Sequence, residues 1–319
     1  MTATSIARCD ADTLALQRGV LSRPQAISLG LTSSAIAARL RSGRWQRLHP
    51  GVYAAFSGDP SRQAMLWAAI LRAGPAAALS HQTAAELHGL SREPAPAIHV
   101  LVPAGRQIAP ISGVALHYSR RVSEARHPVL LPPRTRVEEA VLDLATAASS
   151  LDLALGWIFH ACGSRRTTAG KLSAAMALRP RMRWRGELSE ALSLAASGVH
   201  SLLEFRYVDR VERPHGLLSG KRQHAVRRGS GRQYQDVDYD CYGVVVELDG
   251  QAAHPVGLRW ADIRRDNANA AEGQVTLRYG WPDVTERPCR VAAEIGATLG
   301  QRGWDGTLRR CGRSCELPG

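Results

Sequence analysis

Two stretches in the C-terminal third, residues 233–239 and 243–249, constrain the fold of this chain more than any other feature. Both have the length and composition of β-strands, and residues 240–243 supply a turn between them. The run Val244-Val-Val246 indicates that the second strand is buried. We therefore expect a β-hairpin. A helix over 258–271 and a further apolar strand over 275–279 favour a mixed sheet flanked by helices.

Carboxylates are concentrated on this hairpin. Side chains alternate along a strand, so Asp236 and Asp238 share one face, as do Glu247 and Asp249. If the loop consists of residues 241 and 242, position 238 lies opposite 245 and all four carboxylates share one face; a three-residue loop would reverse this. Opposed like charges destabilise a buried sheet unless a cation lies among them. We therefore predict a Mg²⁺ site, with Mn²⁺ as an alternative ion, formed by Asp238, Glu247 and Asp249.

Such a site suits phosphodiester hydrolysis. The reaction needs a water made nucleophilic and a countercharge for the developing oxyanion, and a metal held by carboxylates supplies both. Glu204 precedes the hairpin on a predicted helix, where a capping box with Ser201 explains it as well as catalysis does. Asp240 fits a turn residue.

The overall charge points to a polyanionic partner. The net charge is +13 and the isoelectric point is about 10.2. Only Lys171 and Lys221 are lysines, so codon usage in a GC-rich genome explains part of the arginine excess. The placement of charge is more informative, because a basic stretch over 221–232 precedes the acidic hairpin. We predict that Lys221 and Arg222 contact DNA.

The first 57 residues predict a winged helix-turn-helix. Ser22 and Gln25 form a capping-box pattern, and Thr32 or Ser33 can cap a second helix over 34–42. A hairpin follows around His49-Pro50-Gly51. In such a fold the second helix and the wing meet phosphates, which predicts four DNA contacts: Arg39, Arg41, Arg44 and Arg47. Three-helix units with a hairpin also serve as protein-docking modules, so that alternative stays open.

Three domains follow from these patterns: a winged helix over 1–57, a mainly helical middle region over 58–195 and a sheet-containing domain over 196–319. The fold class is α/β, or α+β for the chain as a whole. The middle region shows helices over 65–73, 80–90 and 136–148 and strands over 98–102 and 114–118. No carboxylate or cysteine partner is apparent for His81 and His88, which are interpreted as packed or capping histidines rather than metal ligands.

Two runs of the first domain resemble the N-terminal domain of the AbiEi-type antitoxins: Gly19-Val-Leu-Ser-Arg-Pro-Gln-Ala-Ile-Ser-Leu-Gly-Leu-Thr32 and Arg41-Ser-Gly-Arg-Trp-Gln-Arg-Leu-His-Pro-Gly-Val-Tyr53. The resemblance implies a winged helix that binds promoter DNA. The middle region resembles the continuation of AbiEi-like proteins.

The last domain resembles the endonucleases related to very short patch repair enzymes, within the PD-(D/E)xK superfamily. The matching runs include Gly198-Val-His-Ser-Leu-Leu-Glu-Phe-Arg206, Val237-Asp238-Tyr239, Val244-Val-Val-Glu-Leu-Asp-Gly250, Asp262-Ile-Arg-Arg-Asp-Asn267 and Val275-Thr-Leu-Arg-Tyr-Gly-Trp-Pro-Asp-Val284. The resemblance implies a restriction-endonuclease-like fold with Glu204, Asp238 and Glu247 in the site. Asp249 occupies the superfamily's lysine position, so the missing positive charge must come from Arg265, Lys221 or His254.

Six cysteines without a tight framework suit reduced thiols. Cys311 and Cys315 have the spacing of half a zinc site, with Cys289 or a histidine completing it, but a flexible tail with two free thiols is the simpler interpretation. Residues 1–7 lack a signal-peptide layout and no apolar run could cross a bilayer. We therefore expect a cytoplasmic protein without a membrane partner.

These observations lead to one main hypothesis and two alternatives. The main hypothesis is a metal-dependent DNA endonuclease coupled to a winged-helix DNA-binding domain. The first alternative is an antitoxin-like regulator whose nuclease fold no longer catalyses, in which case a nucleotidyltransferase-type toxin is the expected partner. The second alternative is an RNA-processing nuclease. The sequence specifies neither the oligomeric state nor the nucleic-acid structure recognised.

Overall fold

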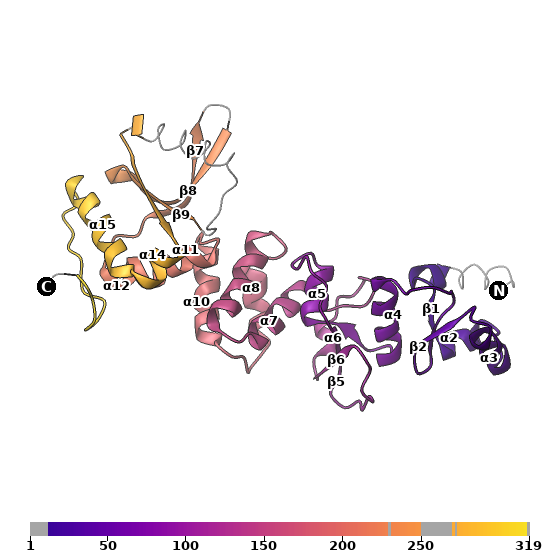
Figure 1. The fold of residues 1–319 in the computed structure, drawn as a ribbon. Coiled ribbons are helices and arrows are strands. Elements are labelled where there is room, and N and C mark those ends of the chain that lie inside the picture. The colour runs from indigo at the N-terminus through magenta and orange to yellow at the C-terminus, as the bar shows by residue number, and fades with distance from the viewer. Residues whose placement is uncertain (1–11, 229–230, 250–269, 272, 318–319) are drawn as a thin grey trace. The chain divides into compact units, whose positions relative to one another are not determined.

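A computed structural model describes residues 12–228, 231–249, 270–271 and 273–317. The chain forms two compact units, Met1–Ala147 and Ala148–Gly319. Each combines helices with small mixed or antiparallel sheets, which confirms the α+β fold class (Figure 1). The boundary at residue 147 lies inside the predicted middle region, and the division into three domains stays a prediction.

The N-terminal unit begins with the winged helix. Residues 12–16 are helical and are followed by β1 (Val20–Ser22), α2 (Arg23–Ser28), α3 (Ser33–Arg41), β2 (Gln46–His49) and β3 (Val52–Ala54). The capping box predicted at Ser22 and Gln25 is present, and Thr32 caps α3. The strands form an antiparallel sheet in the order β1-β3-β2. Strand β1 was not predicted, because three residues are too short for a period-2 signal.

The rest of this unit packs around α4 (Arg62–Ala73). One side of α4 carries Leu66 and Ile70 into the core of a second sheet, and Trp67 lies against the winged-helix sheet. The second sheet has the order β4-β5-β6, with β5 and β6 parallel. Its strands are β4 (Ala78–Leu79), β5 (Ile98–Pro103) and β6 (Val114–Ser119). The helices of this region are α5 (His81–Leu87), α6 (Val122–Ala125) and α7 (Val137–Ala147).

The C-terminal unit starts with three packed helices, α8 (Leu151–Gly163), α9 (Ala169–Ala177) and α10 (Arg185–Ala196). Helix α11 (Leu202–Tyr207) packs on α8, where the rings of Phe159 and Phe205 lie 5.6 Å apart. The chain continues through the π-helical turn η1 (Val208–Glu212) and α12 (Arg213–His215).

The sheet of this unit has the order β10-β9-β8-β7. Strands β7 (Lys221–Arg228), β8 (Gly231–Tyr239) and β9 (Val244–Asp249) are antiparallel neighbours, and β10 (Val275–Gly280) pairs with β9 in parallel. Helices α11, α12, α14 (Trp281–Glu286) and α15 (Pro288–Gln301) gather beside the sheet (Figure 1). Their core includes Val237, Val246 and Ile295. The mixed sheet flanked by helices is therefore confirmed.

Several predicted features fall outside the described residues. These are His254, Arg265 and most of the helix expected over 258–271. None of the described helices is both long and apolar enough to span a bilayer.

Candidate functional site

The carboxylates of the hairpin have the register expected from a loop at residues 241 and 242. Tyr239 pairs with Val244 and Asp238 with Val245, and the short 3₁₀ turn η2 (Asp240–Tyr242) with Gly243 closes the hairpin. Gly243 has a φ of +60°, which favours glycine at the end of such a turn. By alternation from this register, Asp236, Asp238, Glu247 and Asp249 project from one face of the sheet. The prediction that a loop at residues 241 and 242 places all four carboxylates on one face is therefore confirmed.

The opposite face of these strands forms the core, where Val237, Tyr239 and Val246 pack against helices. The carboxylate face is also largely protected from solvent, since Asp238 is 2% and Glu247 9% exposed. Asp238 and Glu247 are diagonal neighbours on adjacent strands, a relation with Cα atoms about 7–8 Å apart. Two carboxylates placed in this way fit a hard cation such as Mg²⁺, which retains several waters.

The third predicted ligand, Asp249, does not join this pair. Asp249 is half-exposed and accepts a hydrogen bond from Arg278 Nη1, 3.4 Å from its Oδ2. Among the described residues, the carboxylates are not found as a set of three whose ligand atoms all lie within 4.8 Å of one another. The described geometry therefore places Asp238 and Glu247 on the same protected face of the sheet, without Asp249 as a third ligand beside them.

Arg278 is the residue that the sequence argument missed. It lies on β10 directly beside Glu247 in the parallel register and contacts Asp249, the residue that the sequence resemblance would align with a lysine. A cation therefore reaches this position from the neighbouring strand. An arginine within the apolar strand 275–279 was the available signal.

One half of the capping box predicted at Ser201 and Glu204 is present, and the Glu204 side chain bonds the residue before Ser201 instead. Its Oε2 accepts the backbone N–H of His200 at 2.9 Å, and its own N–H donates to Ser201 Oγ at 3.1 Å. The side chain is buried. These bonds stabilise the first turn of α11, and a catalytic role for Glu204 stays a prediction.

Lys221 and Arg222 occupy different environments. Lys221 is exposed on β7 and its Nζ donates to Asp240 Oδ2, which raises the pKa of Lys221 and lowers that of Asp240. Arg222 is almost fully buried and paired with Glu212. Lys221 can therefore reach a phosphate, whereas Arg222 belongs to the interior in this structure.

The environment of Arg222 is a buried polar network. Its guanidinium lies 5.4 Å from the ring centre of Tyr207, whose hydroxyl is 2.8 Å from that of Tyr239. Ser219 Oγ donates to Glu212 Oε1 at 3.3 Å. Burial raises the pKa of Glu212 and Arg222 opposes that rise. Arg222 thus offsets part of the cost of burying the Glu212 carboxylate.

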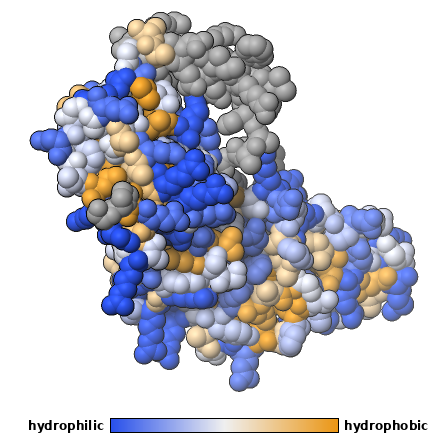
Figure 2. All heavy atoms as spheres, turned by 60° about the vertical axis from the view of Figure 1, so that its left-hand side comes forward, coloured by the Kyte–Doolittle hydropathy of each residue, from blue (hydrophilic) through white to orange (hydrophobic). Residues whose placement is uncertain are grey.

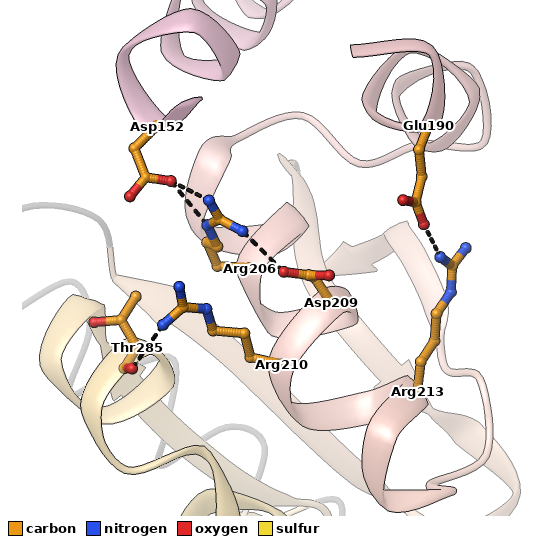
Figure 3. Close-up of polar contacts among 7 residues, drawn as sticks. All are labelled: Asp152, Glu190, Arg206, Asp209, Arg210, Arg213 and Thr285. Atoms are coloured by element: carbon orange, nitrogen blue, oxygen red, sulfur yellow. Dashed lines mark hydrogen bonds and ion pairs between the residues drawn. The ribbon is translucent and has the colours of Figure 1, made fainter. Parts of the chain in front are cut away.

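A second set of ion pairs ties the helices of this unit together (Figure 3). Arg206 Nε donates to Asp152 on α8 at 2.9 Å, and its Nη1 donates to Asp209 at 2.8 Å. Arg213 pairs with Glu190 on α10. These contacts join α8 and α10 to the segment that carries α11 and α12.

The winged helix presents basic and small side chains to solvent. Arg41, Arg44 and Arg47 are exposed, on the end of α3 and the start of the wing. Arg39 is partly buried, because its guanidinium stacks 5.6 Å from Trp45 and its Nη1 donates to Ala35 O. Three of the four predicted arginines are therefore free to meet a phosphate backbone, and Arg39 supports the helix–wing junction.

Three histidines meet in the N-terminal unit although they are distant in sequence. His99 Nδ1 and His117 Nε2 lie 2.9 Å apart, and the ring of His81 stacks on His117 with centroids 3.7 Å apart. Asp143 Oδ2 is 3.8 Å from His81 Nδ1. The sequence interpretation that His81 lacks a carboxylate neighbour is therefore wrong. His88 Nε2 lies 2.8 Å from Thr135 O, a backbone contact expected of a packed histidine.

This histidine cluster predicts that the stability of the N-terminal unit depends on pH. Burial, and then the nearby His81 and His99, lower the pKa of His117 from 6.5 to about 4. The unfolded chain therefore binds more protons than the folded chain between pH 6.5 and 4. The contribution of His117 to the free energy of unfolding is full above pH 6.5 and is lost as the pH falls towards 4. Because the His117 ring is only partly buried, we expect its protonation to lower the free energy of unfolding by about 1–2 kcal/mol.

Thermal unfolding of the N-terminal unit at pH 7 and pH 5 measures this effect. The drop in stability between the two pH values should shrink in His117→Gln and persist in the exposed control His200→Gln. An equal drop in wild type and His117→Gln would contradict this assignment.

The winged-helix fold with exposed arginines defines a class of DNA-binding domain, and the comparisons with known proteins agree for this part of the chain. Residues 10–55 match the family model described as transcriptional regulator, AbiEi antitoxin. The N-terminal segment therefore carries an AbiEi-type regulator domain, as the sequence resemblance implied. No curated protein matches the chain.

Among solved structures, the chain is similar to the crystal structure of RV2827C protein from Mycobacterium tuberculosis. The sequence identity is 18% and the TM-score 0.40, over 60% of this chain and 78% of that one. A likeness at this level supports no argument about function.

Proposed function

We propose that this protein is a DNA-binding transcriptional regulator of the antitoxin type, whose winged helix contacts duplex DNA. The observation that carries the proposal is the exposed surface of α3 and the wing, within the segment that matches the AbiEi antitoxin regulators. Hydrophilic residues cover much of the face drawn in Figure 2, and the chain as a whole carries a net charge of +13.

Helix α3 has the composition of a helix that enters the major groove. Its exposed residues Ser33, Ser34 and Ala38 are short, so the helix backbone can approach base edges closely. Serine can bond to base edges and alanine can pack on a thymine methyl group. The lack of asparagine or glutamine on this helix predicts modest direct base readout.

The arginines around this surface supply the affinity. Arg41 ends α3, and Arg44 and Arg47 continue onto the turn and β2. Contacts of this kind fix register on the phosphate backbone without reading sequence. In an antitoxin-type regulator the DNA is the region upstream of its own gene, and a toxin encoded beside it is the expected protein partner.

Replacing two of these arginines tests the proposal. Arg44→Ala/Arg47→Ala should weaken binding to a duplex from the protein's own upstream region about tenfold or more, and lower the salt slope of log K by about 2. Fluorescence anisotropy at several salt concentrations measures both quantities.

The matched control is Arg92→Ala, which removes an exposed arginine of the same unit outside the winged helix. It should bind like wild type. Wild-type affinity and salt slope in Arg44→Ala/Arg47→Ala would overturn the proposed interface.

A second candidate function is metal-dependent cleavage of DNA by the C-terminal unit. The observation that favours it is the pair of protected carboxylates, Asp238 and Glu247, on one face of a mixed sheet with Arg278 beside them. In this proposal Asp238 and Glu247 hold Mg²⁺, which supplies a nucleophilic hydroxide and a countercharge. Arg278 would orient the scissile phosphate in place of lysine. Cleavage of duplex, nicked and single-stranded DNA with Mg²⁺ or Mn²⁺ tests it.

A further inference from the structure

Four side chains from three parts of the C-terminal unit converge on one point. His215 ends α12, Cys289 lies in the first turn of α15, and Cys311 and Cys315 lie on the tail after α15. One ligand atom from each lies within 4.8 Å of all the others. These residues form the Cys₃His cluster.

The sulfurs are spaced too far apart for a disulfide in this structure, and their spacing fits a tetrahedral metal. Cys289 Sγ lies 3.7 Å from Cys311 Sγ and 3.7 Å from Cys315 Sγ. A disulfide requires about 2.05 Å between one pair of sulfurs. Four ligands around a zinc with Zn–S bonds of about 2.3 Å place neighbouring sulfurs about 3.8 Å apart. The cysteines therefore have the separation of zinc thiolates.

His215 has the burial and hydrogen bonding expected of the fourth ligand. His215 is fully buried, and its Nδ1 lies 2.9 Å from Val211 O. Because the carbonyl can only accept, Nδ1 carries the proton and Nε2 presents a lone pair. Nε2 is buried without a hydrogen-bond partner. Metal-bound histidines are oriented in this way by a backbone carbonyl on the other ring nitrogen.

The surroundings hold the tail in place. Arg309 N–H donates to His215 O at 3.0 Å, and Arg310 Nη2 donates to Cys315 O at 2.8 Å. Cys289 and Cys315 are buried with Leu317 in a small apolar cluster. Residues 304–310 form no helix or strand, so few backbone bonds secure this segment. A cross-link through a metal would account for its packed course.

We infer that His215, Cys289, Cys311 and Cys315 bind one structural zinc ion that fastens the C-terminal tail to α12 and α15. Three thiolates and an imidazole select a soft tetrahedral ion over Mg²⁺ or Ca²⁺. Four protein ligands leave no open position for substrate, so the site is structural. It shares no residue with the carboxylates of the β8–β9 hairpin and does not depend on the proposed function.

Metal analysis of the full-length chain, purified under reducing conditions without chelator, tests the site. Wild type should carry about one zinc per chain. Cys311→Ser should lose most of it, and Cys241→Ser, which changes another exposed cysteine outside the cluster, should keep it. His99→Gln should also keep it, which separates this site from the histidine cluster of the N-terminal unit.

Cobalt substitution reports the ligand set. The Co²⁺ form should show tetrahedral d–d bands and a thiolate-to-cobalt charge-transfer band, with the latter reduced by about one third in Cys311→Ser. If Cys311→Ser fails to fold, titration of wild type with a mercurial thiol reagent replaces it, and one zinc should be released as the cluster thiols react. A wild-type chain without zinc and without a thiolate–cobalt band would overturn the inference, as would unchanged zinc in folded Cys311→Ser.

Discussion

Arg222→Met is expected to lower the free energy of unfolding of the C-terminal unit by about 3–5 kcal/mol. The variant keeps the buried stem of the side chain but removes the guanidinium that pairs with Glu212. Glu212 would then be a buried carboxylate without its counter-ion, the costly case for an interior ion pair. Urea unfolding followed by circular dichroism and tryptophan fluorescence measures the loss.

Two comparisons separate this mechanism from a simple packing defect. The double variant Arg222→Met/Glu212→Leu removes both charges and should recover much of the lost stability. In the single variant, Glu212 takes up a proton in the folded state, so the loss should be smaller at pH 5 than at pH 8. A single variant as stable as wild type would show that the pair contributes little.

Glu247→Gln is expected to lower any Mg²⁺-dependent cleavage by about 100- to 1,000-fold, because it removes one of two protected carboxylate donors. Asp238→Asn should have an effect of the same order. Both changes preserve size, and each should leave DNA binding by the winged helix unchanged. Single-turnover cleavage of a labelled duplex measures the rate.

Arg278→Lys is the informative partner of these variants. Lysine retains the charge beside Glu247, so it should keep most of the cleavage rate, whereas Arg278→Met should lose it. Cleavage that survives Glu247→Gln points to a contaminating nuclease and removes support for the second candidate function. Absence of cleavage in wild type leaves the regulator as the function of the chain.

Features set by local chemistry were predictable from the sequence. The capping box at Ser22 and the cap at Thr32 depend on residues three positions away, so the helix starts of the winged domain follow directly. The hairpin register at Asp238 follows from the loop length, which fixes the parity of both strands.

Features set by long-range contacts were not predictable. Arg278 reaches Asp249 because β10 pairs with β9 in parallel, and no sequence spacing encodes that register. Arg222 is patterned like its basic neighbours, but η1 places Glu212 against it. For Cys311 and Cys315 a zinc site completed by Cys289 or a histidine was considered, but a flexible tail was preferred, because only the folded unit brings His215 and Cys289 to them.

The most direct test of the central claim is hydrogen–deuterium exchange of the full chain with and without a duplex from its own upstream region. Binding by the winged helix predicts added protection in peptides covering α3 and the β2–β3 wing, and little change over β8 and β9. Protection confined to β7–β9, with α3 unaffected, would contradict the account.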